Sequence, residues 1–375
     1  MKLKRLILAG GGHAHVEVLR AFGAKPVPEV DVTLVTPEAD TPYSGMLPGL
    51  VAGHYSWRES HIDLGALARY AGARIKPTRI VGINPGERQV LCADRRVLDY
   101  DLLSLDIGST PPLNEIEGGD QHGVGVRPVE SFLEVWTALC QEARERPLRV
   151  AVVGGGVGGV ELSLAMRHHL RLESGLAPQT DLTLVTEGQS IVPDHSMGVR
   201  RSLQRALARN GVGLLTGLRV VRVDADGLTL EGGAKVPADC VIWATGAAAP
   251  AWLARSGLEL DERGFVLVDE TLQSTSHPGI FAAGDVATMR DHPRPKSGVY
   301  AVHQGPPLAE NLRLALTGES LKRFRPQRRA LALISTGGRH AVASRGGITF
   351  QGWWVWRWKN SIDRKFMARY VVGTK

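Results

Sequence analysis

The feature that most constrains the fold is the segment 149–161, which reads RVAVVGGGVGGVE. An apolar run suited to a buried strand leads directly into a glycine-rich turn that opens a helix. Gly154, Gly156 and Gly159 stand in G-x-G-x-x-G spacing. This spacing supplies a tight turn, a close approach of the backbone to a pyrophosphate, and close packing of helix on strand. The segment therefore predicts a βαβ unit that binds a dinucleotide.

A similar unit stands near the start of the chain, LILAGGGHAHVEVLR at 6–20. A second apolar run at 30–36 completes a βαβ pattern. Its loop keeps Gly10 and Gly12, but His15 occupies the third glycine position. Two such units predict two bound dinucleotides. The expected fold class is α/β, with two Rossmann-like dinucleotide-binding domains.

A carboxylate at the end of the second strand of such a unit accepts hydrogen bonds from the adenosine ribose. In the second unit Glu187 follows the strand expected over 181–186, which favours NADH over NADPH. The alternative is that Glu187 is only a solvated strand-end residue. In the first unit the strand ends at Thr36 and Pro37, and the nearest acid is Glu38. No acid therefore stands in the usual place there.

Clusters of Pro and Gly at 111–123 and 247–250 predict two linkers on either side of the second unit. One domain is therefore inserted into the other. The first domain is expected over 1–112 and 247–320, the inserted domain over 113–246, and a small C-terminal segment over 321–375. Within the first domain, a helix is expected over 62–70 and an antiparallel meander over 74–106. A single strand is expected over 213–223.

The composition limits the cell compartment and the kinds of partner that are expected for this chain. Cys92, Cys140 and Cys240 lie far apart, which argues against a disulfide framework or a zinc site and fits a reducing cytoplasm. No apolar run reaches the roughly 18 residues of a membrane span. The net charge of +7 is local, because residues 321–375 carry 13 basic residues and 1 acidic residue. Nucleic-acid binding is therefore disfavoured.

The C-terminal segment holds four of the eight tryptophans, in WWVWRW at 353–358. At helical spacing one face is expected to carry Trp354, Trp358, Ile362, Phe366 and Tyr370, with Arg and Lys residues interleaved. Such a basic amphipathic helix suits the surface of an anionic membrane, here the inner face of the cytoplasmic membrane. The alternative is that the apolar stripe packs on the first domain or on a second subunit.

Several motifs together resemble the two-dinucleotide-binding flavoproteins, the pyridine nucleotide–disulfide oxidoreductase superfamily. The matching segments are LILAGGGHAH, LSLDIGS at 103–109, VVGGGVGGVE, WATG at 243–246 and GIFAAGDVA at 279–287. The resemblance implies dinucleotide-binding domains of the glutathione-reductase type, with FAD on the discontinuous domain and NAD(P)H on the inserted one. The implied FAD site comprises Gly10, Gly12, His13, Ala14, His15, Thr36, Ser44, Gly45, Met46, Leu47, Pro48, Asp106, Gly108, Gly284, Asp285, Gly298, Val299, Tyr300 and Ala301. The implied NAD site comprises Gly154, Gly156, Val157, Gly158, Gly159, Glu187 and Gly246.

Subgroups of this superfamily differ in their cysteines. Disulfide reductases place a C-x-x-x-x-C pair after the first βαβ unit, yet residues 38–60 contain no cysteine. Sulfide:quinone reductases use a cysteine pair beside the flavin, which Cys140 and Cys240 do not match. The chain is more similar to type II NADH dehydrogenases. YSGMLPGLVAGHY, GVYAVHQGPPLAENL and WKNSIDRKFMARY further resemble the flavoprotein domain associated with selenide, water dikinase.

The expected function is that of an FAD-dependent NAD(P)H oxidoreductase without a redox-active disulfide. Hydride passes from NADH to flavin, and electrons pass to a small-molecule acceptor, either quinone-like or a selenium or sulfur species. The alternative is a flavin-bearing accessory or sensor protein of selenium metabolism with little turnover. Candidate catalytic residues are Glu161, Lys296 and His303. Their plainer interpretations are a favourable acid in a helix first turn for Glu161 and a packed helix residue for His303. No metal site is expected.

Overall fold

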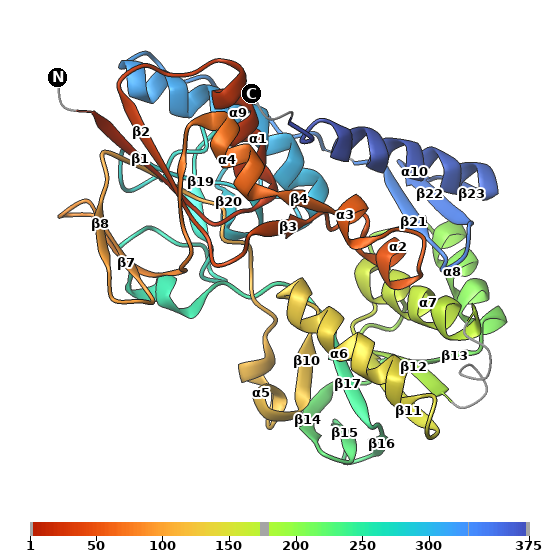
Figure 1. Ribbon diagram of the computed structural model, residues 1–375. Helices are drawn as coiled ribbons and strands as arrows, with labels where there is room; N and C mark the ends of the chain where they lie inside the picture. The colour runs from red at the N-terminus through yellow and green to blue at the C-terminus, as the bar shows by residue number, and fades with distance from the viewer. Residues whose placement is uncertain (1–2, 173–179, 329, 373–375) are drawn as a thin grey trace.

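Two five-stranded parallel sheets form the centre of the molecule. The structure is a computed structural model that describes residues 3–172, 180–328 and 330–372 (Figure 1). The first sheet has the strand order β19-β9-β1-β2-β5, and the second has the order β10-β17-β11-β12-β13. Helices pack against both sheets. The predicted α/β fold with two Rossmann-like domains is confirmed.

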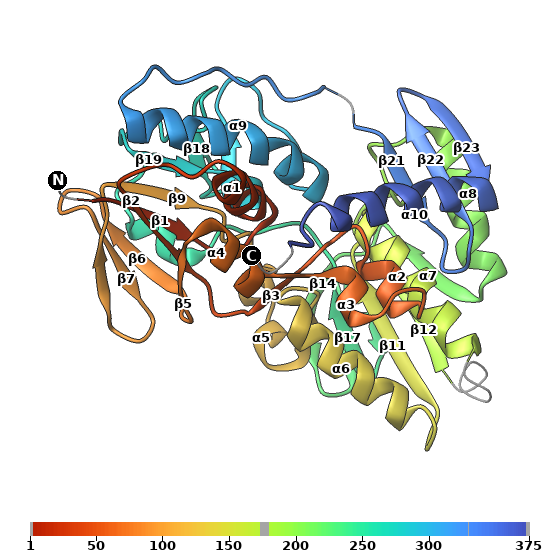
Figure 2. The same cartoon turned by 45° about the horizontal axis from the view of Figure 1, so that its top comes forward.

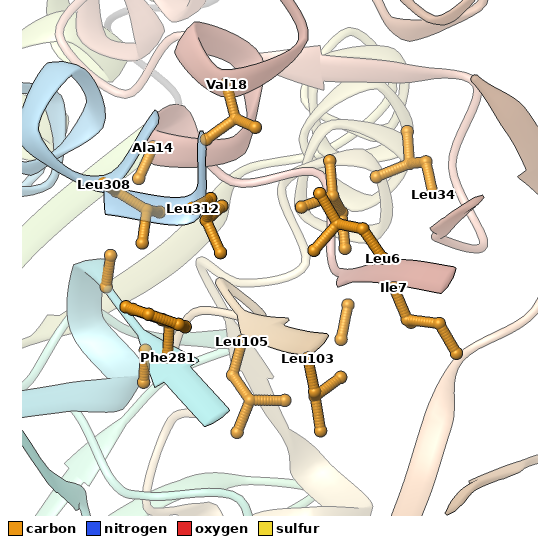
Figure 3. Packing of buried hydrophobic residues seen from close by; sticks show 14 of the residues in the cluster. Leu6, Ile7, Ala14, Val18, Leu34, Leu103, Leu105, Phe281, Leu308 and Leu312 are labelled. Atoms are coloured by element: carbon orange, nitrogen blue, oxygen red, sulfur yellow. The ribbon is translucent and has the colours of Figure 1, made fainter. Parts of the chain in front are cut away.

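The first sheet takes strands from both ends of its domain. They are β1 (Lys4–Ala9), β2 (Val30–Val35), β5 (Arg74–Lys76), β9 (Leu102–Leu105) and β19 (Ile280–Ala282). Helices α1 (His13–Ala24), α4 (Leu64–Ala71) and α9 (Gly298–Thr317) accompany it. The inner strands are buried on both faces, as a covered parallel sheet requires. Figure 3 shows Phe281 of β19 on the side of the sheet that carries Leu308 and Leu312 of α9, whereas Leu103 and Leu105 of β9 point to the other side. All five residues belong to one core cluster.

The second sheet is built from the chain between these strands. Its members are β10 (Gly123–Gly125), β11 (Leu148–Val153), β12 (Thr180–Thr186), β13 (Val212–Thr216) and β17 (Cys240–Trp243). The accompanying helices are α6 (Val129–Glu142), α7 (Val157–Leu172) and α8 (Met197–Arg209). The two connecting segments pair where they cross, because the N–H and C=O groups of Thr110 and Ala248 exchange hydrogen bonds of 2.9 and 2.8 Å.

Four small sheets complete the two domains. They are β6 (Ile80–Asn84), β7 (Gln89–Cys92) and β8 (Val97–Asp99); β14 (Val220–Asp224), β15 (Gly227–Leu230) and β16 (Lys235–Pro237); β3 (Asp40–Pro42) with β4 (His61–Asp63); and β18 (Val266–Val268) with β20 (Ala287–Met289).

Several sequence expectations need correction. The meander expected over 74–106 is confined to β6–β8, because β5 and β9 join the parallel sheet. The single strand expected over 213–223 is two strands, separated where Gly217 adopts a φ of +69°. The helix expected over 62–70 begins at Leu64, because the Asp63 carboxylate caps it by accepting from the Ala66 N–H at 2.7 Å. A short helix, α2 (Leu47–Val51), lies between β3 and β4.

The C-terminal segment bridges the two domains. It forms β21 (Ala332–Ser335), β22 (Ala341–Arg345), β23 (Ile348–Gly352) and α10 (Trp353–Ala368). In Figures 1 and 2 this small sheet lies beside α7 and α8 of the inserted domain, and α10 runs from there toward the first domain. The Lys359 Nζ donates to the Gly45 carbonyl at 2.5 Å, and the Tyr55 hydroxyl donates to Asn360 at 2.9 Å.

The single apolar face expected on the tail helix is divided in two. Phe366 and Tyr370 are buried against the first domain, whereas Trp354, Trp358 and Ile362 are 45%, 42% and 40% exposed. The Tyr43 ring stacks on Phe366 with centroids 4.2 Å apart, and the Tyr370 hydroxyl donates to Glu17 at 3.1 Å. Within the described residues, no helix is both long and apolar enough to cross a membrane.

Phe366 and Ile362 form a matched pair of substitutions on one helix. We expect Phe366→Ala to lower the free energy of unfolding by about 3–5 kcal/mol, because it leaves a cavity between α10 and the first domain. Ile362→Ala should change it by no more than about 0.5 kcal/mol, because that side chain is exposed. Urea unfolding followed by circular dichroism measures both. Equal losses in the two variants would contradict the docked position of α10.

Candidate functional site

The first glycine loop packs directly against Asp106, which follows β9. A Cβ at Gly10 would lie 2.4 Å from the Asp106 carbonyl oxygen, and one at Gly12 would lie 2.4 Å from the Asp106 carboxyl group. The Asp106 carboxylate accepts hydrogen bonds from the N–H groups of Ala14 and His15 at 2.8 and 3.0 Å. Burial raises the pKa of Asp106 to about 7, against the effect of these two bonds. Asp106 therefore caps the first turn of α1.

His15 takes the place of the third glycine as a buried packing residue. Its Nδ1 lies 2.7 Å from the Gly10 carbonyl oxygen and its Nε2 lies 2.8 Å from the Ser104 hydroxyl. Burial lowers the pKa of His15 to about 4, so the ring is neutral. Both ring nitrogens of His15 are therefore engaged within the protein, where they hold the loop.

His13 differs, because its Nε2 is buried and has no hydrogen-bond partner among the described residues. Its ring meets Tyr43 edge-on, with centroids 5.6 Å apart. Burial lowers the pKa of His13 to about 4. A buried polar atom without a partner is costly unless a ligand or water satisfies it. This orphaned nitrogen at the start of α1 fits a site that holds FAD.

Asp285 lies just after β19, in the short 3₁₀ helix η4 (Gly284–Val286), and its side chain is only 9% exposed. It accepts a hydrogen bond of 2.6 Å from the Arg127 Nη1, which also donates to the Ser109 hydroxyl at 2.6 Å. Arg127 stands between β10 and α6, outside every nucleotide motif. It was not predicted from the sequence, because nothing in its local pattern indicates that it reaches back across the linker.

The remaining predicted FAD residues fall into two groups that the fold brings together. Thr36 directly follows β2, and Gly108 lies two residues after Asp106 with a φ of +71°. The segment carrying Ser44, Gly45, Met46, Leu47 and Pro48 meets the start of α9, which carries Gly298, Val299, Tyr300 and Ala301. A Cβ at Gly298 would lie 2.3 Å from the Ser44 hydroxyl. The 249 residues from 49 to 297 separate these segments in the sequence.

Two of the three catalytic candidates, Lys296 and His303, make local contacts. The Lys296 Nζ donates to the Ala287 carbonyl at 2.5 Å and to the Thr288 hydroxyl at 2.8 Å, and it lies 4.0 Å above the Phe265 ring. Burial lowers the pKa of Lys296 to about 8. His303 is exposed on α9, with its Nδ1 2.6 Å from the Val299 carbonyl oxygen. Lys296 thus holds a loop, and His303 makes a bond within its own helix.

In the second glycine loop, some glycines pack tightly against the backbone and others face open space. A Cβ at Gly154, where φ is +129°, would lie 2.5 Å from the Ala244 carbonyl oxygen. One at Gly159 would lie 1.9 Å from the Gly154 carbonyl oxygen. By contrast, nothing lies within 4 Å of a Cβ at Gly156, Gly158 or Gly246. The first N–H groups of α7, from Val157, therefore open on the cleared space that a pyrophosphate needs. Glu187 is exposed directly after β12.

A buried polar cluster joins the inserted domain, the tail and the first domain. The Glu161 carboxylate on α7 accepts from the Ser335 N–H at 2.6 Å. Burial raises the pKa of Glu161 to about 7, and the Lys359 ammonium opposes this rise. Lys359 also pairs with Asp363 at 2.7 Å, and these two side chains are 12% and 5% exposed. Tyr43 hydrogen-bonds Asp363 as well.

Lys359 and Asp363 were not among the residues predicted from the sequence. Their i,i+4 spacing on the tail helix was the available signal, since opposite charges at this spacing pair on one face. They were counted instead among the interleaved charges of an exposed helix.

Residues 4–305 match the family described as pyridine nucleotide-disulphide oxidoreductase. The chain belongs to this family. The expected resemblance to this superfamily is confirmed, and so are FAD and NAD(P)H as its cofactors. The predicted class of enzyme, an FAD-dependent NAD(P)H oxidoreductase, is confirmed as well.

Individual relatives agree with a type II NADH dehydrogenase-like protein. An external alternative NAD(P)H-ubiquinone oxidoreductase of Arabidopsis thaliana is 24% identical, with the match covering 77% of this chain and 55% of that protein. Demethylphylloquinone reductase NdbB of a Synechocystis species is 27% identical over 75% of this chain and 71% of that protein. The structure of NDH2 from Plasmodium falciparum in complex with NADH has a TM-score of 0.80 at 15% identity, covering 99% and 98% of the two chains. At that identity it supports the fold alone.

Substitutions at two glycines of the second loop distinguish a role in packing from a role in ligand binding. We expect Gly159→Ala to lower the free energy of unfolding by about 3 kcal/mol, because its Cβ overlaps the Gly154 carbonyl. Gly156→Ala should leave stability within about 0.5 kcal/mol of the parent protein. It should nonetheless weaken NADH binding about tenfold or more, because its Cβ enters the space of the pyrophosphate and costs a phosphate contact. Thermal melting and NADH titration calorimetry measure the two effects. Unchanged NADH affinity in Gly156→Ala would contradict the assignment.

Proposed function

We propose that this chain transfers reducing equivalents from NADH through FAD to a quinone, without a redox-active disulfide. The observation that carries the proposal is the buried cluster of Glu161, Lys359 and Asp363. It joins the helix of the NAD loop to the segment at Gly45 that is assigned to the flavin. The donor and flavin sites thus share one set of contacts. No cysteine stands in residues 38–60 to take part in a disulfide relay.

The residues of the chain fit the two nucleotides in different ways. We infer that the Asp285 carboxylate accepts hydrogen bonds from the ribityl hydroxyls of FAD and that the ring nitrogen of His13 without a partner among the described residues contacts the same cofactor. Gly156, Gly158 and the start of α7 leave room for the pyrophosphate of NADH, and Glu187 is placed for its ribose. Bound FAD supplies the acceptance of hydride and its onward transfer as electrons.

Glu161 is placed to hold the proton that this reaction consumes. The balanced reaction is NADH + H⁺ + quinone → NAD⁺ + quinol, so one proton comes from solvent. A carboxyl group with a pKa of about 7 carries a proton in part of the population at neutral pH. The adjacent Lys359 ammonium stabilises the carboxylate that remains after the proton leaves.

The function is tested by stopped-flow absorbance of the FAD-loaded protein. We expect NADH to bleach the flavin band and a soluble quinone to restore it. Absence of bleaching would favour the accessory or sensor role. Bleaching without reoxidation by quinone would favour a selenium or sulfur acceptor, which the segments similar to the selenide, water dikinase-associated flavoproteins suggest.

Glu161→Gln gives a pH-dependent test of the proton role. In the parent protein we expect quinone reduction to slow as the pH rises through about 7, because the Glu161 carboxyl loses its proton there. Gln keeps the acceptor oxygen for the Ser335 N–H but cannot release a proton. We therefore expect kcat to fall about a hundredfold and the limb near pH 7 to disappear. The exposed Glu145→Gln on the same domain is the control. A limb that persists in Glu161→Gln would assign the titration to another group.

We also propose that the exposed stripe of Trp354, Trp358 and Ile362 contacts the inner face of the cytoplasmic membrane. These apolar residues stand beside exposed cations on α10, as in helices that lie in the membrane interface. Such contact would bring the protein to membrane quinones.

Flotation with vesicles of phosphatidylcholine and phosphatidylglycerol tests this membrane contact. We expect Trp354→Ser and Trp358→Ser each to lower partitioning about tenfold, because each removes a large apolar side chain from the interface. Val81→Ser and Leu91→Ser, on the exposed side of β6 and β7, are controls that should not change it. A dimer that dissociates on Trp354→Ser, without vesicle binding in the parent protein, would assign the stripe to a second subunit.

A further inference from the structure

A hollow of about 380 Å³ lies between the tail sheet and α10, outside both nucleotide sites. The turn between β21 and β22 contributes Arg339 to it. The first two turns of α10 contribute Trp353, Trp356, Arg357 and Asn360. No role in binding NADH, FAD or an acceptor has been assigned to any of these five residues.

Each arginine of the hollow lies over a tryptophan ring. The guanidinium carbon of Arg339 is 5.7 Å from the Trp356 ring centroid, and that of Arg357 is 5.6 Å from the Trp353 centroid. An arginine over an aromatic face keeps its N–H groups at the edge of the guanidinium plane, where they can still donate. The two rings therefore position two cations without using their donors.

The polar lining of the hollow consists of donors. Among the ion pairs of the described residues, Lys359 pairs with Asp363 and Arg364 pairs with Glu59, whereas no carboxylate pairs with Arg339 or Arg357. The Asn360 Oδ1 already accepts from Tyr55 and Arg364, so its NH₂ group is a further donor. Two guanidinium groups and an amide with no acid among them match the oxygens of a phosphate, which arginine binds through paired N–H groups.

The position of the hollow on α10 identifies the source of the phosphate. Successive helical residues are about 100° apart, so Arg357 and the exposed Trp358 occupy adjoining faces of the helix. The Phe350 ring of β23 extends the apolar face, since it meets Trp354 with centroids 5.9 Å apart. If the apolar face enters a membrane, the hollow stands at the level of the lipid headgroups, where basic residues attract anionic lipids.

We propose that this hollow binds the phosphate of an anionic phospholipid headgroup. The proposal rests on the membrane contact of the Trp354–Trp358 stripe and adds a lipid preference to it. The stripe supplies apolar insertion into any bilayer, and the hollow supplies selection for phosphate groups that lack a neighbouring cation.

The test compares the FAD-loaded parent protein with Arg339→Gln/Arg357→Gln on two kinds of vesicle. One is phosphatidylcholine alone, and the other contains phosphatidylglycerol. Near a membrane surface two cations correspond to a change of about thirtyfold in partitioning. We expect Arg339→Gln/Arg357→Gln to lose this thirtyfold in partitioning onto phosphatidylglycerol vesicles and to partition onto phosphatidylcholine vesicles as the parent protein does. Arg290→Gln/Arg328→Gln removes two exposed charges elsewhere and should leave both values unchanged. The absorbance of bound FAD and the melting temperature establish that each variant is folded.

The outcomes separate the hollow from the membrane contact itself. Equal losses in the two double variants, or an equal loss on both vesicles, would overturn the headgroup site while leaving the membrane contact standing. No binding of the parent protein to either vesicle would overturn both. Glycerol 3-phosphate provides a third arm through quenching of tryptophan fluorescence. Quenching that is abolished in Arg339→Gln/Arg357→Gln, without vesicle binding, would show that the hollow takes a soluble phosphate and not a lipid.

Discussion

The geometry of the two sites depends on the docking of the C-terminal segment across both domains. The domains are also joined by two chain crossings, paired at Thr110 and Ala248, by the Arg127–Asp285 ion pair and by contacts of α2 with α7. The tail adds the bond from the Ser335 N–H to Glu161 on one side and that from Lys359 to Gly45 on the other. Because these contacts belong to one short segment, they fix how the start of α7 faces the segment assigned to the flavin.

The charges at this junction constrain one another. A buried ion pair such as Lys359–Asp363 loses much of its attraction to desolvation, so the pair is a weak source of stability. Its effect on Glu161 is clearer. Burial alone favours the protonated carboxyl, and the Lys359 ammonium lowers the pKa of Glu161 toward neutrality. The cluster is therefore an arrangement in which a proton can be held or released at small cost, which a reaction that consumes one proton requires.

The fold could be predicted from local patterns, because the strand, the glycine turn and the helix of a βαβ unit follow one another in the sequence. Contacts across long separations could not. Arg127 reaches Asp285 over 158 residues, and no periodicity records such a pair. The tail stripe was predicted as one face, and helical spacing does place those residues together. Spacing does not say what covers them, and Tyr43 and Glu17 cover only Phe366 and Tyr370. The meander failed for the same reason, since β5 and β9 are short strands whose partners lie elsewhere.

The two nucleotide loops, similar in sequence, differ in how much of their binding capacity the protein itself uses. In the first loop the Asp106 carboxylate accepts hydrogen bonds from the N–H groups of Ala14 and His15. The His15 ring links the Gly10 carbonyl to the Ser104 hydroxyl. Among its buried side-chain atoms, the Nε2 of His13 is left without a partner among the described residues. In the second loop Gly156 and Gly158 face open space. A loop already held by protein contacts loses little conformational freedom when its ligand binds, which favours tight binding, whereas the second loop leaves its space open for a ligand. The first suits a cofactor retained through many turnovers, and the second suits a substrate that must leave in each.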